Sequence, residues 1–403
     1  MFAGVAYSVG RGRGPGALDS IWAEDGHDFL GDAANLASLD AITTSLNGYY
    51  HLYARLLAEV TTLFPVSWWA AINTWWAVLS TVALAVLVYG ASAAHLRDSY
   101  LRLLVAAPLV VQFVAHGAAA NNVATLQFPA LYALFWLLLQ VQTRRLARIG
   151  APVVALLIAL STTLVVALIP LAVARVALRR DRAGVLLAGA LFAGVAFQLA
   201  GLAAGDADRG GIGYLRIDPL WVIHEFVRVQ LPVSVLGEAW IRGKVVHHGE
   251  HLALILLAWG VVVAAAGVAV SRRSLPVWPL AAVASVHAVA IFGVQVTLIG
   301  SVPDRYLVAS MPLVIVVLVA LMRPTRPTAA APIVALSTLL VVVSLANYRL
   351  DSTRTKRVPS WTAQVRQATV RCKAEPSLSS IVVLSGPRHN IWGTVRLPCD
   401  RLR

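Results

Sequence analysis

Charged residues and cysteines are scarce in this sequence. Only 33 lysines and arginines, 19 aspartates and glutamates and two cysteines occur among 403 residues. So few cysteines exclude a small disulfide-stapled scaffold, and so few charges exclude a disordered chain. Hydrophobic residues make up 59% of the sequence. At about 20 residues per membrane-crossing helix, this composition predicts an all-α polytopic membrane protein with about ten transmembrane helices.

Nucleotide-binding motifs are also lacking. No GxxxxGK[ST] sequence occurs, so we expect no direct use of ATP. In a soluble protein the formal net charge of +14 would suggest nucleic acid as a partner. Here the arginines gather in short connections between apolar runs, a pattern that marks the cytoplasmic side of a membrane protein. We therefore expect a lipid bilayer as the partner and no nucleic acid.

The apolar runs divide the chain into regions. We expect an extracytoplasmic acidic loop with an interfacial helix at 1–66, transmembrane helices at 67–204, an extracytoplasmic loop at 205–250, transmembrane helices at 251–348 and a small extracytoplasmic tail at 349–403. Arginines flank both ends of the run 151–178, so it has to return to the side from which it came. We predict a tight helical hairpin there, with its turn near Ser161–Thr163; one long tilted helix is the alternative. Residues 1–10 would then be the end of a first span that begins upstream.

Carboxylates gather in the first outer region. Glu24, Asp25, Asp28 and Asp32 stand close together, with His27 among them. Neighbouring carboxylates can act as a general base or bind a divalent metal ion. A solvated acidic turn is the alternative, because Asp-Gly is a common turn sequence.

An amphipathic helix is predicted at 49–64, where leucines, Val60 and Phe64 recur at helical spacing. We expect this helix to lie on the membrane surface. His51 and Arg55 near its start could line a site, or they could simply pack, since Arg55 and Glu59 also form an ordinary i,i+4 pair.

Further candidates lie in the later outer regions. Arg305 and Tyr306 stand at the outer mouth of a span, where an arginine suits a phosphate group; a helix cap or a snorkelling arginine is the alternative. Arg216 and Arg228 in the loop 205–250 could attract an anionic head group. His247 and His251 are weak candidates for a metal, because Gly249 weakens the helix that would align them. Cys372 and Cys399 in the tail could form a disulfide in an oxidising exterior, or remain two thiols.

In this order, the features resemble the GT-C class of integral-membrane glycosyltransferases, particularly actinobacterial cell-envelope enzymes. The resemblance covers most of the chain. It rests on the acidic pair Glu24–Asp25, the surface helix at about 49–64, the DRY sequence at Asp304–Tyr306 and the closing WGTVRLPC at Trp392–Cys399. Members of this class transfer a sugar from a polyprenyl-phosphate donor on the extracytoplasmic side of the bacterial plasma membrane.

The resemblance implies roles for these residues. Asp25 or Glu24 would deprotonate the acceptor hydroxyl, and Arg305 with Tyr306 would bind the donor phosphate. Other residues that could line the substrate are Asp28, His51, Arg55, Arg216 and Arg228. No cofactor is certain, and a divalent metal ion stays open. The expected function is sugar transfer to an extracytoplasmic glycan, lipid or protein; the alternative is a transporter or lipid-handling membrane protein without catalysis.

Overall fold

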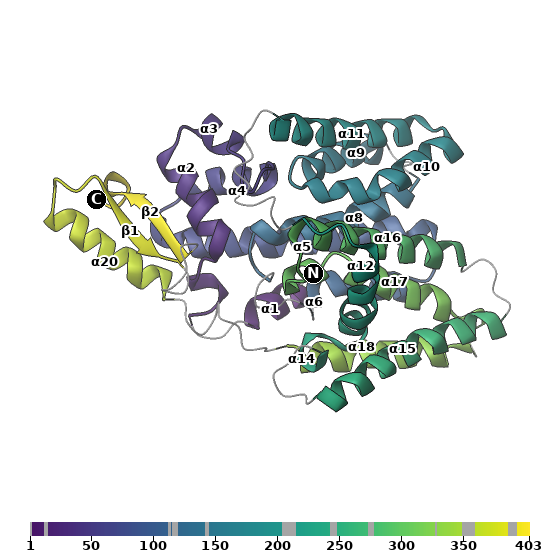
Figure 1. The fold of residues 1–403 in the computed structure, drawn as a ribbon. Coiled ribbons are helices and arrows are strands. Elements are labelled where there is room, and N and C mark those ends of the chain that lie inside the picture. The colour runs from purple at the N-terminus through teal and green to yellow at the C-terminus, as the bar shows by residue number, and fades with distance from the viewer. Residues whose placement is uncertain are drawn as a thin grey trace.

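The structure is a computed structural model, and it describes residues 2–11, 15–111, 114, 120–141, 145–203, 215–241, 248–272, 278–326, 329–348, 359–385 and 393–403. This part is 78% helical and 3% strand. Long helices form a bundle, and shorter helices of the N-terminal part lie at one end of it together with a small C-terminal unit, on the left in Figure 1.

The elements follow in chain order. The first half contains α1 (Phe2–Gly10), η1 (Ala17–Asp19), η2 (Asp25–Leu30), α2 (Gly31–Asn35), α3 (Ser38–Thr43), α4 (Leu52–Thr62), η3 (Val66–Trp68), α5 (Trp69–Ala91), η4 (Ser92–Ala94), α6 (Ser99–Val111), η5 (Ala124–Leu126), α8 (Gln127–Leu139), α9 (Arg145–Ala159), η6 (Thr163–Leu168), α10 (Ile169–Arg179) and α11 (Arg182–Ala203). The second half contains α12 (Pro219–Glu225), η8 (Phe226–Gln230), α13 (Leu231–Leu236), α14 (Glu238–Ile241), α15 (His248–Ser271), α16 (Trp278–Ile299), η10 (Asp304–Leu307), α17 (Met311–Met322), α18 (Ala331–Ala346), α20 (Trp361–Ala374), β1 (Ser380–Leu384), β2 (Thr394–Pro398) and η13 (Cys399–Arg401).

Within the described residues, five helical segments are long and apolar enough to cross a membrane. They are Val66–Ala94, Arg182–Ala203, His251–Ser271, Trp278–Ile299 and Asp304–Met322, and shorter apolar helices occupy Ser99–Val111, Ala124–Leu139 and Ala331–Ala346. The prediction of a helical membrane protein is therefore confirmed. The count of ten spans is not confirmed, because several apolar runs form short or divided helices rather than one helix of full length.

Helix α17 lies at the centre of the bundle. All of its residues except Val317 are buried, and it packs against α6, α13, α15 and α16. Burial on all sides explains why its sequence is apolar around the whole helix rather than along one face. Because η10 leads directly into α17, the position of Arg305 is fixed by the best-packed helix of the molecule.

The run 151–178 is divided at Leu160–Thr162. Helix α9 ends at Ala159, and the side chain of Thr162 accepts a hydrogen bond from the backbone N–H of Leu164 to begin η6. Arg175 near the end of α10 donates to the carbonyl oxygens of Leu137 and Gln140 at the end of α8, five residues before α9 begins. The segment therefore returns to the place where it started, and its turn lies where the sequence predicted one.

The packing of α9 on α11 gives a first prediction. A Cβ atom at Gly194 would overlap the side chain of Ala159, whereas a Cβ atom at Gly189 would meet nothing within 4 Å. Gly194→Ala should therefore push the two helices apart and cost about 1–3 kcal/mol of stability. Gly189→Ala on the same helix is the matched control. Thermal unfolding in detergent checks this, and equal midpoints for the two variants would contradict the close contact.

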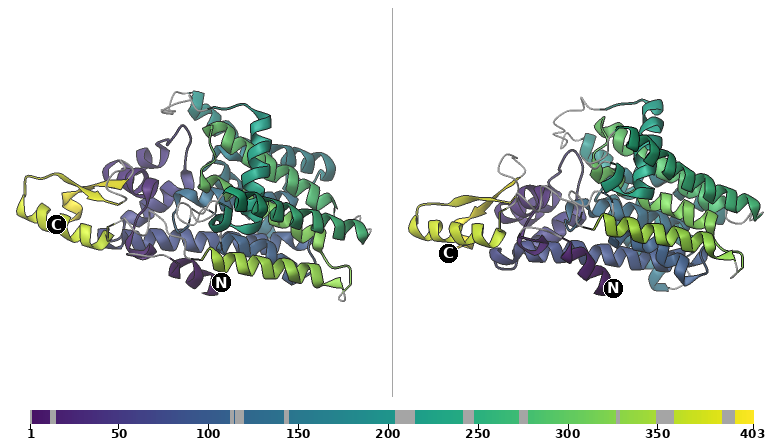
Figure 2. Two further views of the ribbon diagram at one scale, coloured as in Figure 1. Left: turned by 60° about the horizontal axis from the view of Figure 1, so that its bottom comes forward. Right: turned by 90° about the horizontal axis from the view of Figure 1, so that it is seen from below.

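The C-terminal unit packs against the N-terminal helices. Strands β1 and β2 pair antiparallel, with Val382 opposite Arg396. Figure 2 shows α20 and the two strands beside the N-terminal helices in both views. Trp361 donates its indole N–H to the carbonyl oxygen of Val66 and stacks on Trp69. Two segments from opposite ends of the chain therefore share one small core, separate from that of the bundle.

Candidate functional site

Three carboxylates form a row at the end of the bundle. Residues 23–35 are helical throughout and π-helical at η2. Four residues make close to one turn of such a helix, so Glu24, Asp28 and Asp32 lie on one face. We call these three residues the acidic row. Single π-helical turns within helices are frequent at functional sites.

The residue at each end of the acidic row forms an ion pair with an arginine. Arg305 approaches Glu24 with 3.1 Å between Nη1 and Oε1, and Arg55 approaches Asp32 with 2.9 Å between Nη1 and Oδ2. Arg55 is buried and also donates to the carbonyl oxygen of Ala41, whereas the side chain of Arg305 is 39% exposed. Arg55 therefore has a structural role, whereas Arg305 is accessible to a ligand.

Asp28 stands between these two ion pairs. Its Oδ2 atom is buried and has no hydrogen-bond partner among the described residues, although the side chain as a whole is only partly buried. Burial and the neighbouring charges of Glu24 and Asp32 raise the pKa of Asp28 to about 6, against the opposing influence of His27 and Arg55. A carboxyl group with this pKa exchanges its proton near neutral pH.

The environment of Asp25 differs from that of an exposed loop. Its side chain is 1% exposed. It accepts hydrogen bonds from the side-chain amide of Asn73 at 2.6 Å and from the backbone N–H groups of Val123 and Ala124 at 2.8 and 2.7 Å. Asp25 is therefore not a residue of an exposed loop. Its oxygens are engaged by donors of the protein, so it joins η2 to the bundle and is poorly placed to deprotonate a substrate.

An aromatic wall stands beside the acidic row at the start of α4. His51 is 5% exposed, and its ring centroid lies 4.2 Å from that of Tyr49 and 5.3 Å from that of Phe29. Burial, with a smaller contribution from Arg55, lowers the pKa of His51 to about 3. His51 is therefore neutral at physiological pH, and the wall adds no positive charge to the site.

An apolar cavity of about 220 Å³ lies below His51, between α4, α5, α8 and α9. Leu84, Leu87, Leu126, Val154, Leu157 and Ile158 are among its lining residues. Its volume exceeds the roughly 150 Å³ of an apolar cavity that holds benzene. Val123 and Ala124 also line it, so the hydrogen bonds to Asp25 fix one part of its wall.

Tyr49 links this cavity to Arg305. Gln127 lines the cavity and contacts the Tyr49 hydroxyl group, and Tyr49 interacts electrostatically with Arg305, Tyr306 and Glu24. The next residue after Gln127, Phe128, packs edge-on against Tyr306 with 5.4 Å between ring centroids. Arg305 and Glu24 therefore lie near one wall of the cavity, although neither lines it.

Other residues predicted for the site lie elsewhere or are engaged. Arg216 forms an ion pair with Asp218 and lies over the ring of Trp221, and Arg228 is exposed on η8. His251 donates a ring N–H to the carbonyl oxygen of Ile241 at 2.6 Å. His247 and the Trp392 end of WGTVRLPC lie outside the described residues.

The described residues contain no cluster of candidate metal ligands. Among the residues that the structure describes, no group of three or more His, Cys, Asp or Glu side chains could hold a metal ion. In the acidic row, Glu24 and Asp32 each face an arginine. We therefore derive no step through a metal.

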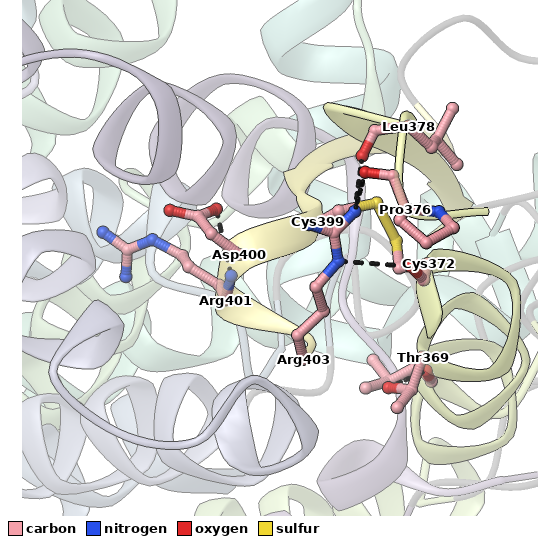
Figure 3. The surroundings of a disulfide bond; sticks show 9 residues. Thr369, Cys372, Pro376, Leu378, Cys399, Asp400, Arg401 and Arg403 are labelled. Atoms are coloured by element: carbon pink, nitrogen blue, oxygen red, sulfur yellow. Dashed lines mark hydrogen bonds between the residues drawn. A yellow bond between two sulfur atoms is a disulfide. The ribbon is translucent and has the colours of Figure 1, made fainter. Parts of the chain in front are cut away.

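Cys372 and Cys399 form a disulfide in the structure, with 5.5 Å between their Cα atoms. Figure 3 shows Arg403 beside this bond, donating to the carbonyl oxygens of Cys372, Pro376 and Leu378. His27 and Asn35 donate to the carbonyl oxygens of Thr394 and Arg396 in β2. The disulfide-linked unit therefore supports the helical stretch that carries the acidic row.

Comparisons with protein families, curated proteins and solved structures give no match. The fold defines the class of this chain as a helical membrane protein, with a polar site at the end of its bundle. Its activity has to be argued from that site.

Sequence reasoning missed several residues of the site. Gln127 had no assigned role, and the four carboxylates were not separated by position, although the i,i+4,i+8 spacing of Glu24, Asp28 and Asp32 was visible. That spacing would have predicted the row if the segment had been read as a helix instead of a turn. Nothing in the sequence pointed to Asn73 as the partner of Asp25.

Proposed function

We propose that this chain is a glycosyltransferase of the bacterial plasma membrane. It moves a sugar from a polyprenyl-phosphate donor to a glycan, lipid or protein acceptor on the extracytoplasmic side. The proposal extends the resemblance to the GT-C class, and the site supports it with groups suited to each part of such a donor.

One observation carries the proposal: Arg305 meets Glu24 across a separation of 281 residues, at 3.1 Å, and Tyr49 links this pair to Gln127 in the wall of an apolar cavity. A polyprenyl phosphate has an anionic head and an apolar chain. Arg305 offers several N–H donors in a plane that matches phosphate oxygens, and the cavity removes apolar surface from water. Glu24 orients the guanidinium group and leaves donors on it for the phosphate.

The chemistry follows from these positions. The acceptor hydroxyl attacks the anomeric carbon of the donor sugar, and the bond from that carbon to the phosphate oxygen breaks. Negative charge develops on the departing phosphate, and a fixed cation at that place lowers the barrier. Arg305 supplies this cation, and a carboxylate of the acidic row takes the proton of the hydroxyl.

The test is the lipid that the protein retains. Native mass spectrometry of the gently purified protein should show a bound polyprenyl phosphate in the wild type, and Arg305→Ala should reduce that occupancy at least tenfold, because it removes the phosphate-binding cation. Arg216→Ala is the matched control: it also removes an exposed arginine paired with an acid, but its partner is Asp218 and not a member of the acidic row. The control should keep the lipid.

The alternative is a carrier or lipid-handling protein without catalysis. An apolar cavity would serve it equally well. Retention of bulk phospholipids alone, in equal amounts in wild type and Arg305→Ala, would reject the donor site and make solute or lipid transport the next assay. If the protein retains a polyprenyl-phosphate sugar but transfers no sugar from it, this result would also favour the alternative.

A further inference from the structure

We propose that Asp28, and not Asp25 or Glu24, is the proton acceptor of the transfer, and that the acceptor hydroxyl binds at the middle of the acidic row. The inference rests on the proposed function, because it names the base of that reaction.

The contacts of the four neighbouring carboxylates separate their roles. Asp25 is buried and accepts three hydrogen bonds from the protein. Glu24 and Asp32 each form an ion pair with an arginine. In each of these two carboxylates one oxygen is therefore engaged by a guanidinium group. Asp28 differs from all three, since its Oδ2 is buried without a hydrogen-bond partner among the described residues.

A buried, unpartnered carboxylate oxygen costs free energy unless the group binds a proton or a ligand. The incoming hydroxyl supplies the missing donor. The buried Nε2 atom of His51 also lacks a hydrogen-bond partner among the described residues, and the His51 ring lies 5.3 Å from that of Phe29, the residue after Asp28.

The charged groups around Asp28 come from several elements. They are Glu24 and His27 from its own helical stretch, Asp32 from α2 and Arg55 from α4, while β2 packs against η2 and carries Arg396 with an exposed side chain. Two carboxylates oppose the ionisation of Asp28, and Arg55 and protonated His27 favour it. With burial added, the pKa of Asp28 is about 6, so the carboxylate is present at neutral pH and still binds a proton strongly enough to act as a base.

In the proposed step, proton transfer to Asp28 accompanies the attack on the anomeric carbon. The hydroxyl O–H bond breaks and its proton passes to Asp28, while the hydroxyl oxygen forms a bond to the anomeric carbon. The bond from that carbon to the phosphate oxygen breaks, and its electron pair stays on the polyprenyl phosphate, next to Arg305. Asp28 then releases the proton to water, and no further reactant is needed.

The experiment compares Asp28→Asn, Asp28→Glu and Asp25→Asn, with Asp40→Asn, an exposed acid of α3, as the control. Donors are a panel of farnesyl-phosphoryl pentoses and hexoses, the acceptor is cell-envelope glycan, and release of farnesyl phosphate is measured between pH 5 and 8. The wild-type rate should fall tenfold per pH unit below about 6. Asp28→Asn should lose at least 100-fold and show no such dependence, and Asp28→Glu should recover part of the rate.

A stability profile provides a readout independent of turnover. Since the folded pKa of Asp28 is raised to about 6, its contribution to stability is fully present below the unfolded value and is lost as the pH rises through 6. Asp28→Asn should therefore unfold at a higher temperature than the wild type at pH 7.5, and the difference should shrink as the pH falls from about 6 to about 4, the ordinary pKa of an aspartate. Normal turnover with an unchanged pH profile in Asp28→Asn would overturn the inference.

The outcomes keep the two proposals apart. Loss of the lipid in Arg305→Ala together with normal turnover of Asp28→Asn would leave the proposed function standing and reject Asp28 as the base. Retention of only bulk phospholipids, with no member of the panel turned over, would reject the proposed function and the base with it. Equal stability of Asp28→Asn and wild type at every pH would show that the carboxyl group does not have the environment on which the inference depends.

Discussion

Asp25→Asn should unfold at a temperature on the order of 5 °C or more below the wild type, with a loss of about 3 kcal/mol in stability. The carboxylate accepts three hydrogen bonds inside the protein. An amide at this position keeps one acceptor oxygen and turns an NH₂ group toward backbone N–H donors. Hydrogen bonds to a charged group are stronger than neutral ones, and donors left buried without a partner add their desolvation cost.

The control for this variant is Asp40→Asn. Asp40 is exposed on α3, and changes at exposed positions usually stay within about 0.5 kcal/mol. Thermal unfolding followed by tryptophan fluorescence measures both variants in the same detergent. If Asp25→Asn keeps the wild-type midpoint and loses only sugar transfer, Asp25 is a catalytic group after all and its structural role is wrong.

Removal of the disulfide is the second large effect that we expect. Cys372 and Cys399 close a loop of 27 residues, for which loop entropy gives a contribution of about 3.5 kcal/mol. The double variant Cys372→Ser/Cys399→Ser should therefore loosen the C-terminal unit, and trypsin should cut within 359–403 well before it cuts elsewhere. Because β2 accepts hydrogen bonds from His27 and Asn35, the helical stretch with the acidic row should lose support at the same time.

Ser377→Ala provides the control for the double variant, since Ser377 is exposed between α20 and β1. It should leave the proteolysis pattern unchanged. Treatment of the wild type with a reductant should reproduce the result of the double variant. Equal protease resistance of the double variant, the reduced wild type and the untreated wild type would show that packing alone, through Trp361 and Trp69, stabilises the C-terminal unit.

The site illustrates where sequence reasoning succeeded and where it failed. Glu24 and Arg305 were selected from local features, an acidic segment and an arginine at the mouth of a span, and the structure places them in contact. Asp25 was expected in an outer acidic loop, either as the base or in a solvated Asp-Gly turn. Its actual environment depends on Asn73, Val123 and Ala124, which come from other parts of the chain. Local propensity carries no information about such partners.

The sequence by itself determined that this protein is a helical membrane protein. The transfer of apolar side chains out of water adds up residue by residue along each helix, so composition and the length of the apolar runs are enough. The sequence also favoured a turn near Ser161–Thr163 and allowed a disulfide between the two cysteines, but it left the alternatives open. The class of the protein needs no knowledge of distant contacts.

Only the tertiary structure decided what each carboxylate can do. Glu24, Asp25 and Asp28 are chemically similar and stand within five residues of one another. One pairs with an arginine 281 positions away, one is buried among donors from the bundle, and one keeps an unpartnered oxygen. The affinity of a carboxylate for a proton depends on burial, nearby charge and hydrogen bonds, and folding fixes all three through contacts between segments far apart in the chain.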